Sequence, residues 1–122
     1  MSRRVLIVED EQIVAADLES KLTRMGYSVV GTAASGEEAI RLAGEEKPEI
    51  VVMDIQLQGA MKGTEAAELI QRDLGAKILL VTAFAGVFAR DPKFRRLPWK
   101  CISKPFSAVQ LRSALDEMAR DG

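Results

Sequence analysis

Histidine is absent from all 122 positions of the sequence, and its absence excludes several kinds of active site. Ser-His-Asp and Cys-His sites need an imidazole as the general base, and histidine-ligated zinc sites need it as a metal ligand. Histidine is also the side chain whose charge ordinarily changes near neutral pH. Any chemistry in this chain must therefore use carboxylates, lysine, hydroxyl groups or a bound ion.

Cysteine pairs, long apolar runs and excess charge are also missing. The single cysteine cannot form an internal disulfide, which favours a reducing compartment and a cytoplasmic protein. No apolar run approaches the roughly 20 residues that a helix needs to span a bilayer. A net charge of −1 gives no electrostatic reason to bind nucleic acid or a membrane surface. With 48% hydrophobic residues, the chain is predicted to form one globular domain over residues 1–122.

Short apolar segments recur along the chain, and their residues do not alternate with polar ones. They are rich in valine and isoleucine and comprise residues 4–9, 27–33, 49–54, 77–83 and 100–104. Runs of this kind are typical of parallel strands that are covered on both faces. The segments between them have helical spacing, as Val14, Leu18, Leu22 and Met25 illustrate. The pattern predicts an α/β fold in which a strand and a helix alternate five times.

This (βα)5 alternation predicts a doubly wound, three-layer sandwich whose five-stranded parallel sheet has the flavodoxin-like order 2-1-3-4-5. Another doubly wound domain, one that binds a nucleotide, is the second candidate. It is disfavoured because no G-x-G-x-x-G follows the first strand and no G-x-x-x-x-G-K-[ST] occurs anywhere.

Polar signals indicate where the helices begin. Capping boxes predict helix starts at Ser35 with Glu38 and at Ser107 with Gln110. Residues 85–99 have only weak helix signals, because they contain two prolines and a basic run, and they leave room for a short helix. The apolar stripes are predicted to be Leu69, Ile70 and Leu74 in the third helix, which closes at Gly75, and Leu111, Leu115 and Met118 in the last.

Polar side chains also stand at the carboxyl ends of the predicted strands: Glu9 and Asp10 after the first, Asp54 after the third, Thr82 in the fourth and Lys104 in the fifth. In open α/β sheets, ligands bind beyond these ends, and strands one and three are neighbours in the predicted order. Asp10 and Asp54 are therefore expected to face one crevice. Each residue alone has an ordinary explanation as a helix start, a turn residue or a surface group. Their joint occurrence indicates a site.

The acidic residues of this crevice suit a magnesium ion. Clustered carboxylates repel one another unless a cation compensates, and Mg²⁺ prefers oxygen ligands together with retained water. The candidate ligands are Glu9, Asp10, Asp54 and the backbone carbonyl of Gln56.

The same crevice suits phosphoryl transfer. A carboxylate can act as a nucleophile and form an aspartyl-phosphate, and Asp54 is the residue held at the end of a rigid strand. Lys104 would add positive charge beside the phosphoryl oxygens, and the Thr82 hydroxyl would hold one of them by a hydrogen bond.

The segments "VLIVEDE", "VVMDIQL", "LLVTA" and "SKPF" together resemble the receiver domain of two-component response regulators, and the resemblance covers the whole chain. It implies that Glu9 and Asp10 are the acidic pair, that Asp54 is the phosphoacceptor and that Mg²⁺ is the cofactor. It also implies that Thr82 is the switch hydroxyl, that Lys104 senses the phosphate and that the Lys104–Pro105 peptide bond is cis.

The resemblance also implies partners. The phosphoryl donor in this family is a phosphohistidine on a sensor histidine kinase or a histidine phosphotransfer protein. A chain without histidine can receive from such a donor but cannot be one. We therefore expect a signalling module that acts on a downstream protein, and no enzyme activity beyond self-phosphorylation and autodephosphorylation.

Two features depart from the family pattern. The family usually has an aromatic switch residue three positions before the lysine, and here Cys101 stands there. The loop at residues 56–63 is slightly longer than usual and lacks proline.

The face that often carries output or dimer contacts in this family would include basic residues 90–100. There Trp99 is either an anchor for a partner or homodimer, or a cover for the edge of the core.

Two other functions compete with this interpretation. A phosphatase or phosphotransferase of the haloacid dehalogenase type also uses an aspartate at a strand end, but it needs a second aspartate two residues later. Here that residue is Gln56, and the chain has no segment for a cap domain. A degenerate receiver that only binds proteins is disfavoured because Asp10, Asp54, Thr82 and Lys104 are all present.

Overall fold

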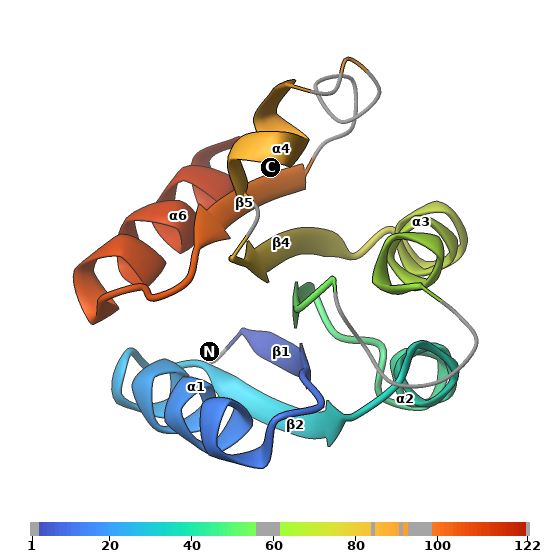
Figure 1. Cartoon of the computed structure of the whole chain (residues 1–122). Helices are drawn as coiled ribbons and strands as arrows, with labels where there is room; N and C mark the ends of the chain where they lie inside the picture. The colour runs from blue at the N-terminus through green and yellow to red at the C-terminus, as the bar shows by residue number, and fades with distance from the viewer. Residues whose placement is uncertain (1–2, 56–61, 84, 91, 93–98, 122) are drawn as a thin grey trace.

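Strands and helices alternate along the chain in the computed structural model, which describes residues 3–55, 62–83, 85–90, 92 and 99–121 (Figure 1). The strands are β1 (Arg4–Val8), β2 (Ser28–Ala33), β3 (Ile50–Met53), β4 (Lys77–Thr82) and β5 (Trp99–Ser103). The helices are α1 (Gln12–Arg24), α2 (Gly36–Glu46), α3 (Gly63–Leu74), α4 (Ala85–Arg90) and α6 (Ala108–Asp121). All the predicted strands are thus present at the expected places.

The strands form one sheet in the order β2-β1-β3-β4-β5, and each neighbouring pair is parallel. The predicted doubly wound α/β fold with the order 2-1-3-4-5 is therefore confirmed. Figure 1 shows α1 and α6 on one side of the sheet and α2 and α3 on the other. We call these two sides the α1/α6 face and the α2/α3 face.

Burial on both faces explains why the strand sequences do not alternate. In β1, Val5 and Ile7 belong to the core on the α1/α6 face, whereas Leu6 and Val8 belong to the core on the α2/α3 face. All four side chains are fully buried. Since successive side chains of a strand point to opposite faces, every position of a central strand must be apolar.

Large side chains fill the α1/α6 face. The predicted stripe of α1 is confirmed, because Leu18 and Leu22 are buried and Val14 and Met25 pack against the same cluster. The stripe of the last helix is confirmed as well, since its three predicted residues are buried: Leu111, Leu115 and Met118. A leucine contributes roughly 1.5–3 kcal/mol when its side chain is fully buried, so these residues hold α1 and α6 on the sheet.

Small side chains fill much of the α2/α3 face. The buried residues that the helices contribute are mostly Gly36, Ala39 and Ala43 from α2 and Gly63, Ala66 and Ala67 from α3. The stripe predicted for the third helix was wrong at Leu74, whose side chain is 41% exposed, whereas Ile70 is buried. Leu74 is the last residue of α3, where the chain turns away at Gly75 with a φ of 71°. The buried side of α3 therefore includes the alanines Ala66 and Ala67 and excludes Leu74.

Both predicted capping boxes occur at helix starts. Ser35 Oγ accepts a hydrogen bond from the amide of Glu38 at 3.2 Å. At the start of α6 the box is reciprocal, since Ser107 Oγ accepts from the amide of Gln110 and Gln110 Oε1 accepts from the amide of Ser107. These bonds satisfy amide groups that a helix start leaves without partners.

The segment with weak helix signals contains the short helix α4, which contacts β5. Trp99 is half-buried and packs against the core of the α2/α3 face, which supports its role as a cover for the edge of the core. Most of the basic segment, residues 91 and 93–98, lies outside the described residues.

Candidate functional site

The register of the sheet brings Glu9 and Asp54 together. Val8 pairs with Met53 at the ends of β1 and β3, so the next residue of each strand enters the same crevice. The amide of Asp54 donates to the carbonyl of Val8 at 2.9 Å, which extends the ladder by one residue. Both acidic positions are thus fixed by main-chain hydrogen bonds before any side chain is considered.

Lys104 enters from the other half of the sheet. Thr82 pairs with Ser103 at the ends of β4 and β5, and the amide of Lys104 donates to the Thr82 carbonyl at 2.9 Å. The Thr82 side chain is buried. The Lys104–Pro105 peptide bond is cis, as the resemblance implied.

Lys104 bridges two buried carboxylates. Its Nζ lies 2.9 Å from Glu9 Oε2 and 3.0 Å from Asp54 Oδ2. Glu9 is only 3% exposed and Asp54 only 6%, so the ion pairs are largely shielded from water. The other oxygen of Glu9 accepts the amide of Glu11 at 3.2 Å. Two buried charges of one sign are tolerated here because a cation and hydrogen bonds compensate them.

The shifts in pKa follow from this arrangement. Burial and the neighbouring Asp54 charge raise the pKa of Glu9 above its ordinary value, although the hydrogen bond from Lys104 opposes the shift. Burial acts to lower the pKa of Lys104, but its hydrogen bonds with Glu9 and Asp54 outweigh burial and the net pKa is raised. Lys104 therefore remains a cation at neutral pH and beyond.

The carboxylates also meet the requirements of a small hard cation. Glu9, Asp10 and Asp54 each offer an oxygen, and these oxygens lie within 4.8 Å of one another. Asp10 is half-buried and faces the same crevice. An all-oxygen donor set that is partly open to water fits Mg²⁺. The fourth predicted ligand, the carbonyl of Gln56, lies outside the described residues.

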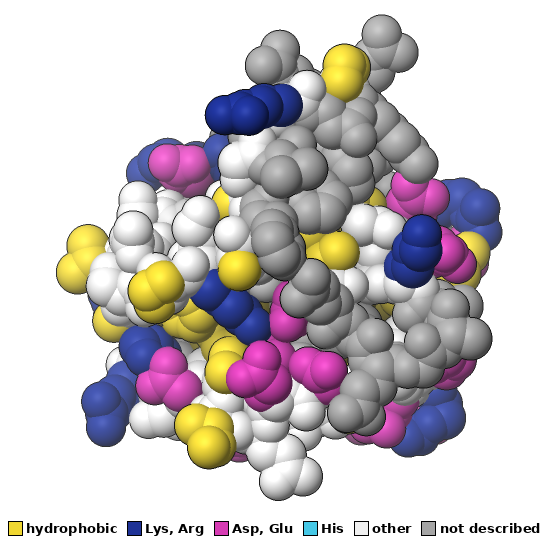
Figure 2. All heavy atoms as spheres, viewed as in Figure 1, with side chains coloured by type: hydrophobic (Ala, Val, Ile, Leu, Met, Phe, Trp, Pro, Cys, Tyr) yellow, Lys and Arg dark blue, Asp and Glu magenta, His cyan; other side chains and the backbone are white. Residues whose placement is uncertain are grey.

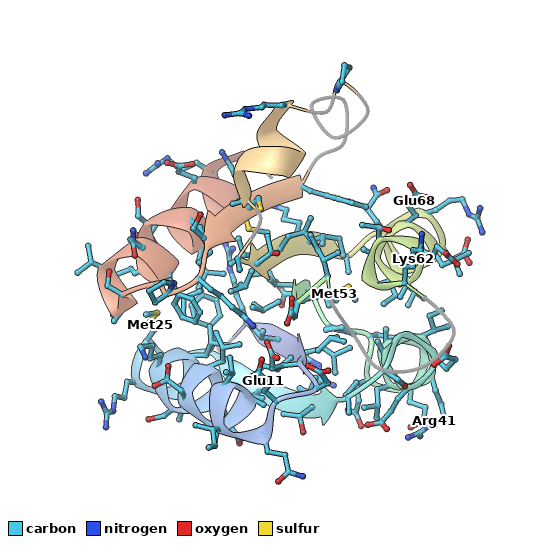
Figure 3. The ribbon with its side chains drawn as sticks, viewed as in Figure 1. Glu11, Met25, Arg41, Met53, Lys62 and Glu68 are labelled. Atoms are coloured by element: carbon cyan, nitrogen blue, oxygen red, sulfur yellow. The ribbon has the colours of Figure 1, made fainter. Side chains whose placement is uncertain are left out.

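The surface above the strand ends combines charge with apolar area. Figure 2 shows acidic side chains gathered near the middle of this view, with a basic side chain and hydrophobic side chains beside them. Glu11, just before α1, and Met53, at the end of β3, are labelled in Figure 3 and come from the two segments that carry the acidic residues.

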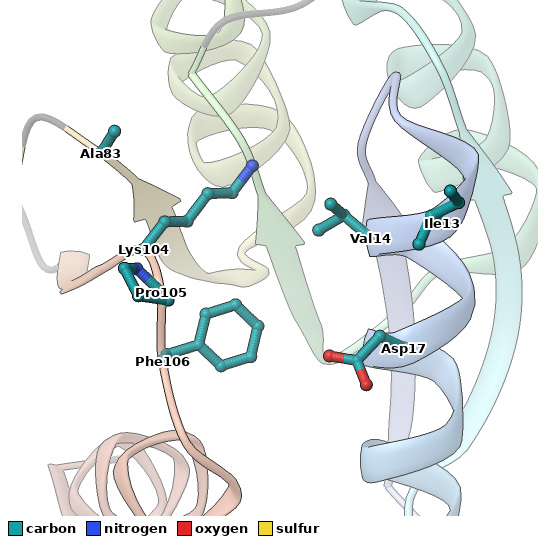
Figure 4. Close-up of a pocket in the computed structure, with 7 residues that line it drawn as sticks. All are labelled: Ile13, Val14, Asp17, Ala83, Lys104, Pro105 and Phe106. Carbon is teal, nitrogen blue, oxygen red and sulfur yellow. The ribbon is translucent and has the colours of Figure 1, made fainter.

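An apolar groove opens beside the acidic crevice. It has a volume of about 610 Å³ and is lined by Ile13, Val14, Asp17, Ala83, Lys104, Pro105 and Phe106. In Figure 4 the Lys104 side chain and the Phe106 ring both reach from the segment before α6 toward α1. Ile13 is 87% exposed and therefore adds apolar surface to the rim of the groove. The groove therefore joins an apolar surface to the cation that contacts Asp54.

Phe106 and α1 are linked below this groove. The Nζ of Lys21 lies 5.7 Å from the centre of the Phe106 ring and also pairs with Asp17, one turn earlier in α1. This cation–π contact holds the ring against the helix. The sequence did not predict the groove, although an apolar Ile13 two residues after the acidic run and a phenylalanine after the Lys-Pro pair were visible signals.

Cys101 packs against the core but stays partly exposed. Its side chain is half-buried against the α2/α3-face core, and burial raises the pKa of its thiol. A protonated thiol is a poor nucleophile. The position that is usually aromatic in the resembled family is thus taken here by a small apolar group.

Known proteins share this arrangement over nearly the whole chain. The sequence model of the family described as the response regulator receiver domain matches residues 5–116 of this chain. The chain belongs to this family. Receiver domains are signalling modules of two-component systems that interact with kinases or downstream effectors, and they bind Mg²⁺ at an acidic pocket.

Two curated relatives illustrate the range of this family. The chain is 42% identical over 117 residues to the transcriptional regulatory protein PdtaR of Mycobacterium tuberculosis, covering 93% of this chain and 55% of PdtaR. It is 33% identical over 121 residues to the chemotaxis protein CheY of Thermotoga maritima, covering 98% of this chain and 100% of CheY. Unlike CheY, several curated relatives are matched over about half of their length or less.

A solved structure supports the same assignment. The receiver domain of the response regulator PhyR from Erythrobacter litoralis, determined by solution NMR, superposes with a TM-score of 0.86 at 30% sequence identity. The match covers 97% of this receiver domain and 90% of that chain. Within the described part of this receiver domain, none of the helices has both the length and the apolar character that crossing a membrane requires.

Proposed function

We propose that this receiver domain accepts a phosphoryl group on Asp54 from a phosphohistidine of a partner protein and then presents a changed surface to a downstream protein. The observation that carries the proposal is the setting of Asp54. Its carboxylate is buried at the end of β3, is contacted by Lys104 and lies within reach of Glu9 and Asp10. A carboxylate in this setting is held in one direction and is surrounded by groups that can bind a phosphoryl group.

The transfer itself is a displacement at phosphorus. One oxygen of Asp54 attacks the phosphorus atom, and an O–P bond forms while the N–P bond to the donor imidazole breaks. The leaving nitrogen keeps the electron pair of the N–P bond, and the imidazole, protonated on its other nitrogen, leaves as a neutral ring. Lys104 is proposed to balance charge on the phosphoryl oxygens, and the Thr82 hydroxyl is proposed to hold one of them.

Glu9, Asp10 and Asp54 are proposed to hold Mg²⁺, with the Gln56 carbonyl as a further ligand. When bound, this ion supplies positive charge to the phosphoryl oxygens. Lys104 now contacts two of these carboxylates, so the proposal requires it to move from Glu9 and Asp54 toward the phosphoryl group. Its flexible stem of four methylene groups permits such a movement.

The groove is the proposed docking place for the donor protein. It is apolar, it is lined by Lys104 at one end, and it exposes Ile13 on α1. A sensor histidine kinase or a histidine phosphotransfer protein that fills this groove with an apolar side chain would bring its phosphohistidine toward Asp54. A small phosphodonor needs no such contact.

Intact-mass measurement after incubation with Mg²⁺ and acetyl phosphate tests the proposal. The wild-type protein is expected to gain one phosphoryl group, and Asp54→Asn none, because the amide is not a nucleophile of this kind. Asp73→Asn, at an exposed carboxylate of α3, is the matched control and should behave as the wild type does. Undiminished phosphorylation of Asp54→Asn would remove Asp54 from its proposed role.

The same experiment separates the competing functions. Continuous consumption of the donor over many turnovers without a lasting mass gain would favour a phosphatase of the haloacid dehalogenase type. No mass gain in the wild type would favour a receiver that serves only as a binding scaffold.

Asp10→Ala tests the metal site. Loss of this ligand is expected to weaken Mg²⁺ binding by at least about tenfold, since loss of even an outer partner of a ligand has that effect. Without Mg²⁺ the variant is expected to be slightly more stable than the wild type, because repulsion among the carboxylates falls. Calorimetric titration with Mg²⁺ and thermal unfolding with and without the ion measure both effects. Wild-type affinity in the variant would exclude Asp10 as a ligand.

A further inference from the structure

Gly63 is the first residue of α3, and it lies against the main chain that carries Asp54. Its amide approaches the carbonyl oxygen of Ile55, with an N···O distance of 3.3 Å. A Cβ atom added to Gly63 would lie 2.7 Å from that oxygen, 2.8 Å from the carbonyl oxygen of Asp54 and 2.9 Å from the Ile55 Cα. All three neighbours are main-chain atoms, so a side chain at position 63 cannot be accommodated by a change of rotamer.

Asp54 is therefore held from two sides. On one side its amide donates to the carbonyl of Val8 in β1 at 2.9 Å. On the other side its carbonyl faces the Cα of Gly63 at a distance that leaves no room for a methyl group. The first contact belongs to the sheet, and the second belongs to the start of α3. A methyl group at Gly63 must displace either the helix start or the peptide unit that follows Asp54.

The direction of that displacement matters for the site. The Asp54 carboxylate is directed at Lys104 by a contact of 3.0 Å and is grouped with Glu9 and Asp10. A tilt of the peptide unit between Asp54 and Ile55 would rotate the side chain relative to these partners. A misplacement of reacting groups by about 1 Å can lower a reaction rate by about 100-fold.

We propose that Gly63 is a positioning residue for phosphoryl transfer. It has no side chain, so the start of α3 can press on the main chain of Asp54 and Ile55 and set the direction of the Asp54 carboxylate. This inference rests on the proposed function, because the reaction that Gly63 would assist is phosphorylation of Asp54.

Other glycines of the chain show what is particular to this position. Gly44, inside α2, and Gly86, inside α4, have open space where a Cβ would be added. An alanine at Gly44 is expected to be harmless or stabilising, because alanine has the highest helix propensity. Gly44→Ala is therefore the matched control for a glycine-to-alanine change in a helix.

The test compares the wild type, Gly44→Ala, Gly63→Ala and the double variant Gly44→Ala/Gly63→Ala. The double variant offsets part of any loss of stability, so that activity can be measured on folded protein. Phosphorylation by acetyl phosphate is followed by intact mass at saturating Mg²⁺ over a range of donor concentrations. Amide resonances of Asp54 and Ile55 are compared by heteronuclear NMR, and folding is monitored by thermal unfolding.

In both variants with Gly63→Ala, the maximal rate is expected to fall about 10- to 100-fold, the size expected for a misplaced carboxylate. The donor concentration at half-maximal rate should stay close to the wild-type value, because donor binding is not altered. The amides of Asp54 and Ile55 should shift, whereas Gly44→Ala should match the wild type in all of these measurements.

The proposal fails if folded Gly63→Ala or the double variant is phosphorylated at the wild-type maximal rate. It also fails if the double variant is unfolded at the assay temperature, since Gly63 would then serve the fold and not the reaction. If neither the wild type nor Gly44→Ala gains a phosphoryl group, the proposed function itself is wrong and the positioning role falls with it. The last outcome is distinguishable from the first two. It is seen in the wild type and in Gly44→Ala, which keep Gly63, whereas the first two are seen in variants that carry Gly63→Ala.

Discussion

The α1/α6 face and the α2/α3 face of the sheet are packed with side chains of different size, and they shape the site differently. On the α1/α6 face, leucines from both helices fill the core. On the α2/α3 face, glycine and alanine supply most of the buried helical positions. The distance between packed elements depends on the side chains at their contact. The face with small residues allows α2 and α3 to pack closely against their neighbours.

The two faces also differ in what they place near Asp54, since one brings a helix start against its main chain and the other carries a groove lined by its partner Lys104. Close packing on the α2/α3 face lets Gly63 touch the main chain of Asp54. On the α1/α6 face, the segment before α6 leaves an apolar groove against α1, with Phe106 as one wall. One face thus contacts the main chain of Asp54, the proposed phosphoacceptor, whereas the other carries the groove proposed as the docking place for the donor protein.

The largest effect is expected from a cavity on the α1/α6 face. Leu115→Ala removes a fully buried side chain and is expected to lower the free energy of unfolding by about 2–5 kcal/mol. Urea denaturation measures this loss. The phosphorylation rate of the remaining folded protein should change little, because Leu115 does not belong to the core cluster that adjoins Gly63. A large loss of phosphorylation rate without a loss of stability would contradict the idea that the α1/α6 core stabilises the fold without positioning Asp54.

A smaller effect on stability is expected from overpacking of the α2/α3 face. Ala67→Leu adds three carbon atoms at a fully buried position of α3 and is expected to cost about 1–3 kcal/mol. Because α3 also carries Gly63, the displaced helix should slow phosphorylation by acetyl phosphate more than Leu115→Ala does. The comparison uses urea denaturation and intact mass on both variants. Equal phosphorylation rates in the two variants would contradict the idea that α3 supports the site.

The smallest effect on stability is expected at the groove. Ile13→Ser changes an exposed side chain and should alter the free energy of unfolding by no more than about 0.5 kcal/mol. It should nevertheless slow transfer from a phosphohistidine protein, because an apolar contact is lost, while acetyl phosphate should react as with the wild type.

Val109→Ser is the matched control for this change. Val109 is 77% exposed at the start of α6 but does not line the groove. Rates of transfer from the phosphorylated donor protein, measured for both variants, decide the comparison. Equal rates for Ile13→Ser and Val109→Ser would indicate that the groove is not the docking surface.

The order of the elements and the grouping of the acidic residues were predictable because both follow from local patterns and one topological rule. Runs such as Ile50–Met53 are apolar at every position only when both faces of a strand are buried. Parallel strands end at one edge, so Glu9 and Asp54 on the neighbouring strands β1 and β3 had to lie close together once the strand order was known, whereas that order places Lys104 only at the same edge. Leu74 was predicted wrongly because periodicity identifies a stripe but not the residue at which the helix leaves the core.

Gly63 and the groove could not be predicted in this way. A glycine at a helix start can serve a turn or allow a close approach of two main-chain segments. Only the structure shows which applies to Gly63, because an added Cβ would lie 2.7 Å from the Ile55 carbonyl oxygen. The groove depends on where Phe106 lies relative to α1, and these segments are far apart in the chain.

The sequence by itself determined the (βα)5 alternation, the strand ends that carry Glu9, Asp10, Asp54, Thr82 and Lys104, and the exclusion of histidine chemistry. It could do so because side-chain type and spacing are local properties that burial acts on directly. Only the tertiary structure decided that Lys104 bridges Glu9 and Asp54, that Gly63 lies close to the Asp54 main chain and that Ile13 borders a groove. These contacts join residues from different strands and helices, and their distances depend on how closely each helix packs on the sheet.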